Sequence, residues 1–266
     1  MTTPTYDAVN RAGWNGLSRT TCDSSQICEI GALRCAQQIL DPGGWLPWDR
    51  LRRVLCLASG GGQQGPMFAA LGYQVTVADL SAGQLALDAE AADRYGLVIE
   101  RLECDVLDLS PLADRRFDLV YQPVSTLYLP DVRRCYRQVA SVLRPGGLYW
   151  SEHWNPVEMQ LDPETAWDGR AYRLSIPQRA GPLPAPAGST ARTAVCWHYI
   201  HSLEDLVGGI CDAGFAIRRL RERPGTDLGA VPGTRAHLGA YVPAFFSVLA
   251  ERLAVAPQPP DLGVSR

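Results

Sequence analysis

A glycine-rich turn between two short apolar runs carries the first residues that could hold a ligand. Residues 54–57 have the length of a buried strand, and the turn at residues 59–62 follows them. Glycine lets backbone approach a bound molecule closely, because it has no side chain. A second apolar run, residues 75–78, leads directly into Asp79. Strand, glycine turn, helix, strand and terminal acid together predict half of a nucleotide-binding α/β sheet.

The glycine spacing by itself permits a dinucleotide as the ligand. Gly60, Gly62 and Gly65 match the G-x-G-x-x-G fingerprint, and Asp79 has the place of its ribose-binding acid. Taken alone, this pattern would support an NAD(P)-dependent oxidoreductase. It is a weak signal alone, so the choice of ligand depends on motifs further along the chain.

Four histidines are the candidates for a general base, since imidazole titrates near neutral pH. His153 follows the fifth predicted strand, at the carboxyl edge where open α/β sheets bind ligands. His198 and His201 precede a helix that Ser202 should cap, and His237 is expected at the surface. We predict catalytic roles for His153 and His198. The alternative for each is a polar residue whose hydrogen bonds are satisfied at the end of a strand.

Aromatic side chains near the fourth and fifth predicted strands could form the wall of a second pocket. Tyr121, Tyr128, Trp150 and Trp154 lie there. Their rings could line such a pocket or hold a cationic group through the π face. For Tyr121 and Trp150, packing in the core is an equal or better interpretation.

Apolar runs and turn signals predict seven strands with helices between them. Ser81 and Gln84 form a capping-box pattern, and Gly96 should end that helix. Strands that alternate with helices predict an α/β protein with a parallel sheet and helices on both faces. The strands are expected at residues 54–57, 75–78, 97–102, 117–122, 148–152, 215–221 and 245–252, and the main helices at residues 27–40, 63–71, 82–95, 131–143 and 203–212.

Two regions interrupt this alternation. Residues 1–50 precede the first strand, and they either cover an edge of the sheet or bring Tyr6, Trp14 or Arg19 over the ligand site. Residues 154–200 form a long irregular insertion that is rich in aromatic residues. Such insertions are usually functional or mobile, so we expect a substrate cap rather than structural padding.

Composition excludes several classes of protein. The 266 residues carry a net charge of −3 without a long basic run, which argues against a nucleic-acid partner. The N-terminus lacks the pattern of a signal peptide, and every apolar run is too short to span a membrane. Eight scattered cysteines without a C-x-x-C pair suit reduced thiols, so we expect a cytoplasmic protein without a metal site.

Five segments together resemble the class I S-adenosylmethionine-dependent methyltransferases, over about residues 53–252. They are VLCLASGGG, VTVADLS, CDVLDL, FDLVYQ and LRPGGLYW, each at the start or end of a predicted strand. The resemblance implies a Rossmann-like, seven-stranded, mostly parallel sheet with an antiparallel last strand. It also implies S-adenosylmethionine (SAM) as cofactor, and methyl transfer to an oxygen or nitrogen of a small organic molecule.

The resemblance assigns roles to individual residues. In the family, the glycine turn accommodates the methionine part of SAM, the acid at Asp79 binds the ribose hydroxyls, and the acid at Asp105 meets the adenine amino group. Carboxylates suit both tasks, because they accept hydrogen bonds from hydroxyls and amines. The predicted cofactor-binding residues are Ser59, Gly60, Gly61, Gly62, Gln63, Asp79, Leu80, Asp105, Val106 and Gln122, and the predicted substrate-binding residues are Ser125, Tyr128 and Trp154.

One part of the family pattern is missing. The usual first motif has an acid in the first strand and a glycine that opens the turn, whereas this chain has Cys56 and Ala58. Loss of the acid removes one anchor for the ammonium end of SAM. A backbone carbonyl, or a group such as Gln63, must then serve.

The predicted organisation has five parts. They are an N-terminal helical cap segment (1–50), the SAM-binding core (51–153), a substrate-cap insertion (154–200), the completion of the core sheet (201–253) and a flexible tail (254–266). Two alternatives stay open at this point. One is the NAD(P)-dependent oxidoreductase, and the other is a non-catalytic or regulatory SAM-binding protein.

Overall fold

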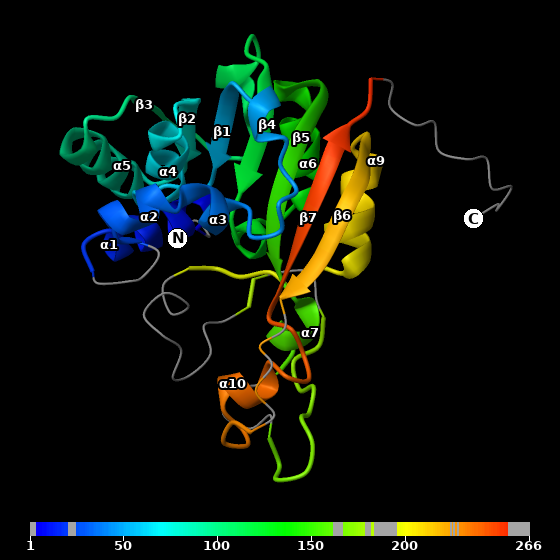
Figure 1. Cartoon of the computed structure of the whole chain (residues 1–266). Coiled ribbons are helices and arrows are strands. Elements are labelled where there is room, and N and C mark those ends of the chain that lie inside the picture. Colours follow the sequence, from blue (N-terminus) through cyan, green and yellow to red (C-terminus); the bar gives the residue numbers. More distant parts are fainter. Residues whose placement is uncertain are drawn as a thin grey trace, which may run out of the picture.

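A seven-stranded sheet forms the centre of the computed structural model (Figure 1), which describes residues 4–20, 25–161, 167–178, 182–183, 196–223, 225, 227 and 229–254. The strand order is β3-β2-β1-β4-β5-β7-β6. Strands β1 to β5 pair in parallel, and β7 is antiparallel to both β5 and β6. The predicted sheet is thus confirmed. Its strands are β1 Arg53–Leu57, β2 Gln74–Asp79, β3 Ile99–Glu103, β4 Phe117–Gln122, β5 Leu143–Trp154, β6 Phe215–Arg223 and β7 Phe245–Arg252.

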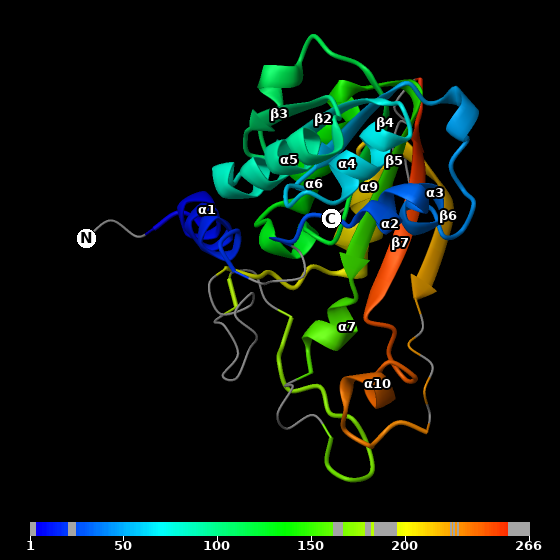
Figure 2. The same cartoon turned by 60° about the vertical axis from the view of Figure 1, so that its left-hand side comes forward.

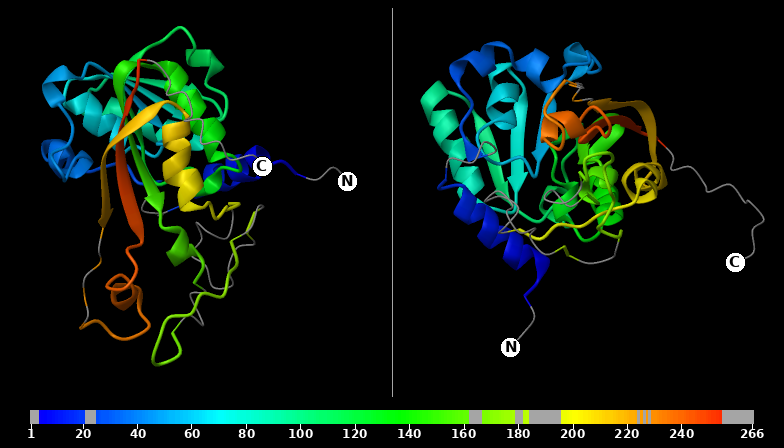
Figure 3. Two further views of the ribbon diagram at one scale, coloured as in Figure 1. Left: turned by 90° about the vertical axis from the view of Figure 1, so that its right-hand side faces the viewer. Right: turned by 90° about the horizontal axis from the view of Figure 1, so that it is seen from below.

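The central strands are apolar along their length because both faces of the sheet are covered. On one face lie α4 (Gln64–Ala70) and α5 (Ala82–Tyr95), and on the other lie α6 (Val132–Val142) and α9 (Gly209–Asp212), as Figure 3 shows. The apolar residues of each face form a separate cluster. The predicted bounds of β4 and β7 match residue for residue, whereas β5 and β6 extend beyond their predicted ends.

Helix caps follow the sequence signals, with one difference. The Ser81 hydroxyl accepts a hydrogen bond from the Gln84 amide at 3.1 Å, and Gly96 ends α5 at φ 65°. The Gln84 side chain does not complete the capping box. Its amide group donates instead to the Trp14 carbonyl and the Ser25 hydroxyl, so it joins α5 to the N-terminal region.

The single helix predicted at residues 27–40 is wrong, because the chain forms two shorter helices there. They are α2 (Ile30–Arg34) and α3 (Ala36–Leu40), and Cys35 between them leaves helical geometry at φ −108°, ψ 20°. A longer helix, α1 (Tyr6–Leu17), precedes them and packs against α5. The Asn15 side chain fixes this contact, since its oxygen accepts from the Ser81 hydroxyl at 2.7 Å and the Gly83 amide at 2.9 Å.

Beyond the carboxyl ends of the strands, α7 (Pro156–Met159) and α10 (Arg235–Leu238) extend the molecule away from the sheet (Figure 2). Helix α10 belongs to the β6–β7 connection, which the sequence did not assign to a cap. It packs against the insertion, where the Tyr172 hydroxyl lies 2.7 Å from His237 Nδ1. His237 is buried within these rings, so its predicted surface position is wrong.

The remaining elements are short. The helix predicted at residues 203–212 is a π-helical turn, Glu204–Gly208, continued by α9, and the Ser202 hydroxyl accepts from the Asp205 amide as predicted. Single 3₁₀ turns occupy Trp48–Arg50, Ser110–Leu112 and Thr126–Tyr128. The predicted tail lies outside the described residues from 255 onward, as do parts of the insertion. None of the described helices is long and apolar enough to cross a membrane.

Candidate active site

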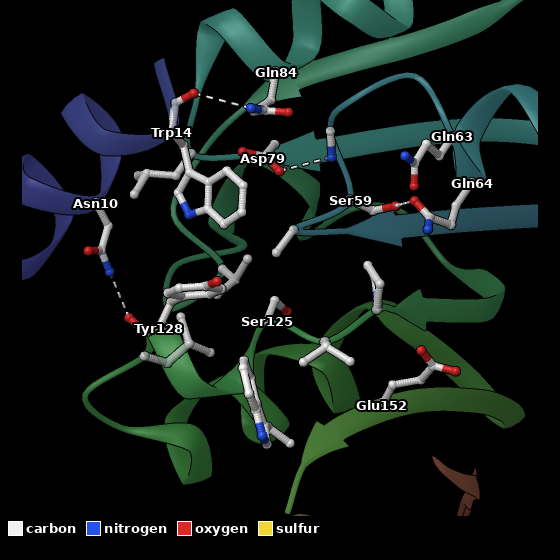
Figure 4. Close-up of a pocket in the computed structure, with 18 of the residues that line it drawn as sticks. Asn10, Trp14, Ser59, Gln63, Gln64, Asp79, Gln84, Ser125, Tyr128 and Glu152 are labelled. Atoms are coloured by element: carbon white, nitrogen blue, oxygen red, sulfur yellow. Dashed lines mark hydrogen bonds between the residues drawn. The ribbon is translucent and has the colours of Figure 1, made fainter. Parts of the chain in front are cut away.

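A cavity of about 480 Å³ lies at the carboxyl ends of β1, β2, β4 and β5 (Figure 4). The strand order reverses beside β1, which is where open α/β sheets bind ligands. Helix α1 closes one side of the cavity, and Trp154 at the end of β5, Arg235 of the β6–β7 connection and Phe245 at the start of β7 close another. Among the described residues of the insertion, none after Trp154 lines the cavity. Ten of the residues predicted for the site line the cavity: Ser59, Gly60, Gln63, Asp79, Leu80, Asp105, Val106, Ser125, Tyr128 and Trp154.

The glycine turn packs so tightly that side chains are excluded from it. A Cβ atom on Gly60 would lie 2.7 Å from Gln84 Cβ and 3.1 Å from Asp79 Oδ2. Gly61 and Gly62 have φ values of 120° and 74° and lie behind the cavity wall rather than in it. Ala58, where the family has glycine, adopts φ 47°, a left-handed conformation that costs about 1–2 kcal/mol for a residue with a Cβ atom.

Asp79 is fixed at the end of β2 by backbone amides. Its Oδ2 accepts from the Gly60 amide and its Oδ1 from the Ser81 amide, both at 2.9 Å. Burial raises the pKa of this carboxyl, and the hydrogen bonds from Ser81 and Gly60 oppose that shift. Each oxygen keeps a second lone pair, so the carboxylate can still accept two hydrogen bonds from a vicinal diol.

Asp105, after β3, meets a residue of α1 across the cavity. The Tyr6 hydroxyl donates to Asp105 Oδ2, and the Leu107 amide donates to Oδ1 at 2.8 Å. Burial and this carboxylate raise the pKa of Tyr6, so the phenol stays protonated as a donor. Helix α1 therefore covers the end of the cavity that the resemblance assigns to adenine.

Two further residues of α1 belong to the cavity wall, Asn10 and Trp14. The Asn10 side chain donates to the Tyr128 carbonyl at 2.9 Å and accepts from the Trp197 amide at 2.7 Å. Trp14 meets the Tyr128 ring edge-to-face, with centroids 5.2 Å apart. Of the three residues proposed to reach over the site, Tyr6 and Trp14 line it, whereas Arg19 is exposed and lies elsewhere.

Gln122 lies beneath the cavity and not in its wall. Its side chain is fully buried, donates to the Ser125 hydroxyl at 2.8 Å and accepts from the Tyr149 hydroxyl at 2.5 Å. Ser125 does line the cavity. Gln122 thus contacts Ser125 from outside the cavity, and this placement differs from the cofactor contact that was predicted.

Trp154 forms the centre of the other half of the cavity. Its ring packs against Phe245, with centroids 5.4 Å apart, and the Arg235 guanidinium lies 5.5 Å above it. The indole nitrogen donates to the half-buried carboxylate of Glu158, which fixes the plane of the ring. Arg235 reaches the cavity from α10, far along the sequence, so no local pattern could have identified it.

Glu152, on β5, also belongs to the cavity wall. Its carboxylate forms an ion pair with Arg223 and accepts a weak hydrogen bond from Ser247 at 3.4 Å. Its charge is balanced within the protein. The wall also includes residues that sequence reasoning did not select: Ala58, Gln64, Gln84, Pro123, Val124, Leu129, Glu152, Arg235 and Phe245.

Neither histidine predicted as catalytic lines the cavity. His153 is fully buried between Thr126 Oγ1, 3.1 Å from its Nδ1, and Ser151 Oγ, 2.8 Å from its Nε2. Burial lowers the pKa of His153 to about 3, so the ring is neutral. His153 is therefore a core histidine with a hydrogen-bond partner at each ring nitrogen, which is the alternative stated above. In this position it does not contact a molecule in the cavity.

His198 lies behind the cavity wall, with its ring 5.0 Å from that of Tyr128. Burial lowers its pKa to about 4, and within the described residues its Nε2 has no hydrogen-bond partner. No group of three or more metal-ligating side chains occurs in the described part of the chain.

The fold and site define a class of protein. A sheet of this order, with its cavity at the topological switch point and acids after β2 and β3, is that of a Rossmann-like enzyme with a nucleoside-containing cofactor.

Comparison with known proteins identifies the family. A methyltransferase domain model matches residues 55–151. An uncharacterized methyltransferase, YbaJ, of Bacillus subtilis is 37% identical over 188 residues, which cover 69% of this chain and 73% of that protein. The chain therefore belongs to the class I SAM-dependent methyltransferases, and SAM rather than NAD(P) is its cofactor.

Two further comparisons agree. The crystal structure of a SAM-dependent methyltransferase from Mesorhizobium loti superposes with a TM-score of 0.61 at 26% identity, covering 84% of this chain and 96% of that one. A malonyl-[acyl-carrier protein] O-methyltransferase of Enterobacter lignolyticus is 32% identical over 105 residues, 39% of each chain.

The residues present fit the cofactor. Gly60 keeps the turn free of a side chain that would displace Asp79, and the Asp79 carboxylate has acceptors left for the ribose hydroxyls. Asp105 and the Tyr6 hydroxyl would hold the adenine end. When bound, SAM supplies a methyl group on a positively charged sulfur. The chain contributes position and the exclusion of water, because transfer of such a methyl is an in-line displacement.

Proposed function

We propose that this methyltransferase acts on an oxygen or nitrogen atom of a small organic molecule bound beside Trp154. The supporting observation is that one cavity of about 480 Å³ contains both the cofactor residues and a separate aromatic half. Tyr128, Trp154 and Phe245 wall that half, and flat apolar surfaces of this kind suit a small, partly planar acceptor.

The ionisable groups of the aromatic half favour acceptors that need no general base. Glu152 is paired with Arg223, and the buried histidines stay neutral behind the wall. A carboxylate or a neutral amine is already nucleophilic, so positioning alone can bring it into line with the methyl group. The acceptor atom is then a carboxylate oxygen or the nitrogen of an uncharged amine.

Of these two acceptor groups, the carboxylate is the better match to the cavity because of Arg235. Among the described residues of the cavity wall it is the one with a positive charge. It forms no ion pair with a described carboxylate, although its charge acts to lower the pKa of Glu158 behind Trp154. A guanidinium presents a planar fork of donors that matches a carboxylate. The relative named a malonyl-[acyl-carrier protein] O-methyltransferase transfers its methyl group to oxygen, which agrees with an oxygen acceptor.

The test is to incubate the purified enzyme and isotopically labelled SAM with fractionated bacterial metabolites, and to identify labelled products by mass spectrometry. We expect methyl esters, recognised by release of labelled methanol in mild base. Labelled products that resist base and carry the methyl on nitrogen would retain methyl transfer but remove the carboxylate assignment. Labelled products methylated on carbon would contradict the proposal.

A further inference from the structure

A buried carboxylate that sequence reasoning did not select contacts the glycine turn. Asp88 lies on α5 and is fully buried, and its Oδ2 accepts from the Gly61 amide at 3.0 Å. The same amide lies 3.1 Å from the Gln84 carbonyl. Within the described residues, the other oxygen, Oδ1, has no hydrogen-bond partner. Asp88 does not line the cavity, so any effect on the cofactor acts through the turn.

Consecutive amides of the turn are held by two carboxylates. Gly60 donates to Asp79 and Gly61 donates to Asp88, which fixes the planes of two successive peptide bonds. The first strand supplies no carboxylate here, since Cys56 is a fully buried thiol at the position where the family usually has an acid. In this chain the second acid reaches the turn from α5 instead.

The surroundings of Asp88 disfavour the ionised form of its carboxyl group. Burial raises the pKa of Asp88 to about 7, against the effect of the Gly62 and Gly61 amides. Asp79 on β2 raises it further, Arg101 on β3 lowers it, and the thiols of Cys56 and Cys28 lie nearby. A buried charge with an unpartnered oxygen destabilises a fold, and such groups concentrate at functional sites.

We propose that Asp88 is a positioning residue for SAM. Its carboxylate orients the Gly61 amide and thereby the Ser59–Gly60 backbone that faces the cavity. Its negative charge behind the turn also favours a cofactor that carries positive charge on its ammonium and sulfonium groups. Binding of SAM then favours the ionised carboxylate, so SAM affinity rises with pH as Asp88 loses its proton.

The test compares Asp88→Asn with the wild-type enzyme by calorimetric titration of SAM. Asparagine preserves the shape and one acceptor but removes the charge. We expect the Kd for SAM to rise at least fivefold at pH 8. Asp93→Asn, an exposed substitution on the same helix, is the matched control and should stay within twofold of wild type.

Two further measurements separate positioning from a merely structural role. The Tm of Asp88→Asn at pH 8 should equal or exceed that of the wild type, since a buried charge has been removed. Between pH 6 and 8, wild-type affinity should increase several-fold more than that of the variant. A Kd within twofold of wild type, or identical pH profiles, would overturn the proposal.

Proton release provides a test that needs no variant. Titrations of the wild type at pH 7, in buffers of different ionisation enthalpy, should show protons released on SAM binding. S-adenosylhomocysteine, which lacks the sulfonium charge, should release fewer. Equal release with both ligands would contradict a role for the Asp88 charge, whatever the outcome for the acceptor.

Discussion

The two halves of the cavity are built in different ways. In the cofactor half, backbone amides at the ends of β1 and β2 are bound to the carboxylates of Asp79 and Asp88. In the acceptor half, rings from separate segments pack against one another, such as Trp154 against Phe245. One half is defined by hydrogen bonds between the sheet and its helices, and the other by ring contacts where β5 ends and β7 begins, together with Arg235 of the β6–β7 connection.

This difference follows from what each half must recognise. A constant ligand with hydroxyls and charges is held best by fixed polar groups on a rigid scaffold. An acceptor that differs between enzymes is recognised by segments attached to that scaffold, which can change without disturbing it. Substitutions in one half should therefore leave the other half largely unaffected.

The largest effect is expected for His153→Ala, which belongs to neither half. Removing the ring leaves Thr126 and Ser151 without their partner and opens a cavity in the core. We expect the free energy of unfolding to fall by about 2–4 kcal/mol, measured by urea denaturation. Cofactor affinity and turnover per folded molecule should change little. Loss of turnover with unchanged stability would instead restore the general-base role predicted from the sequence.

The same residue predicts sensitivity to acid. The pKa of His153 is lowered to about 3 in the folded protein, whereas the unfolded chain takes up the proton near the ordinary value for histidine, about 6.5. The unfolded state thus binds more protons between these values, so stability falls as the pH is lowered from about 6.5 toward 3. Denaturation at a series of pH values should show a shallower decline in a His153→Gln variant.

Asp79→Ala should affect the cofactor half alone. It removes a charged acceptor of the ribose hydroxyls and releases the Gly60 amide. We expect SAM binding to weaken by about 1.5–3 kcal/mol, measured by calorimetry. The acceptor KM at saturating SAM should be unchanged. Unaltered SAM affinity in the folded variant would refute the assignment of Asp79.

Trp154→Ala should affect the acceptor half alone. Loss of the indole face removes apolar contact with the acceptor, worth about 1–2 kcal/mol, so the acceptor KM should rise roughly tenfold. The Kd for SAM should stay within twofold. An equal loss of SAM affinity would show that the two halves are not independent.

Arg235→Gln is expected to give the smallest effect. The side chain is exposed to solvent, which weakens its electrostatic contribution. The KM of an anionic acceptor should rise about threefold to fivefold, whereas that of a neutral analogue should not change. Arg235→Lys keeps the charge without the planar fork and is the matched comparison. Equal effects on both acceptors would remove the anion-binding role.

Most residues that were predicted from the sequence to bind the cofactor line the cavity, because local patterns encode this part of its wall. Strand, turn and acid follow one another within residues 53–79, and caps such as Ser81 need only a few neighbouring residues. The family resemblance added Asp105. The Asp88 contact was missed because a carboxylate within a helix gives no sign that it meets a turn twenty-seven residues earlier.

The acceptor half was less predictable because long-range contacts build it. Arg235 reaches the cavity from the β6–β7 connection, and Asn10 and Trp14 reach it from a helix that had no clear signal. The histidines show the same limit. A strand end marks where His153 lies, but only the packing of Phe246 beside it shows that the ring faces the core.

Helix α1 connects the two halves and so has a thermodynamic consequence. Tyr6 binds Asp105 beside the cofactor, while Asn10 binds the Tyr128 backbone and Trp197 on the acceptor side. If the first ligand to bind orders this helix, the second ligand no longer bears that part of the entropic cost of ordering it. The affinities of cofactor and acceptor should then be positively coupled, and the coupling must be reciprocal. Steady-state kinetics would show it as an apparent KM for each ligand that falls as the other approaches saturation.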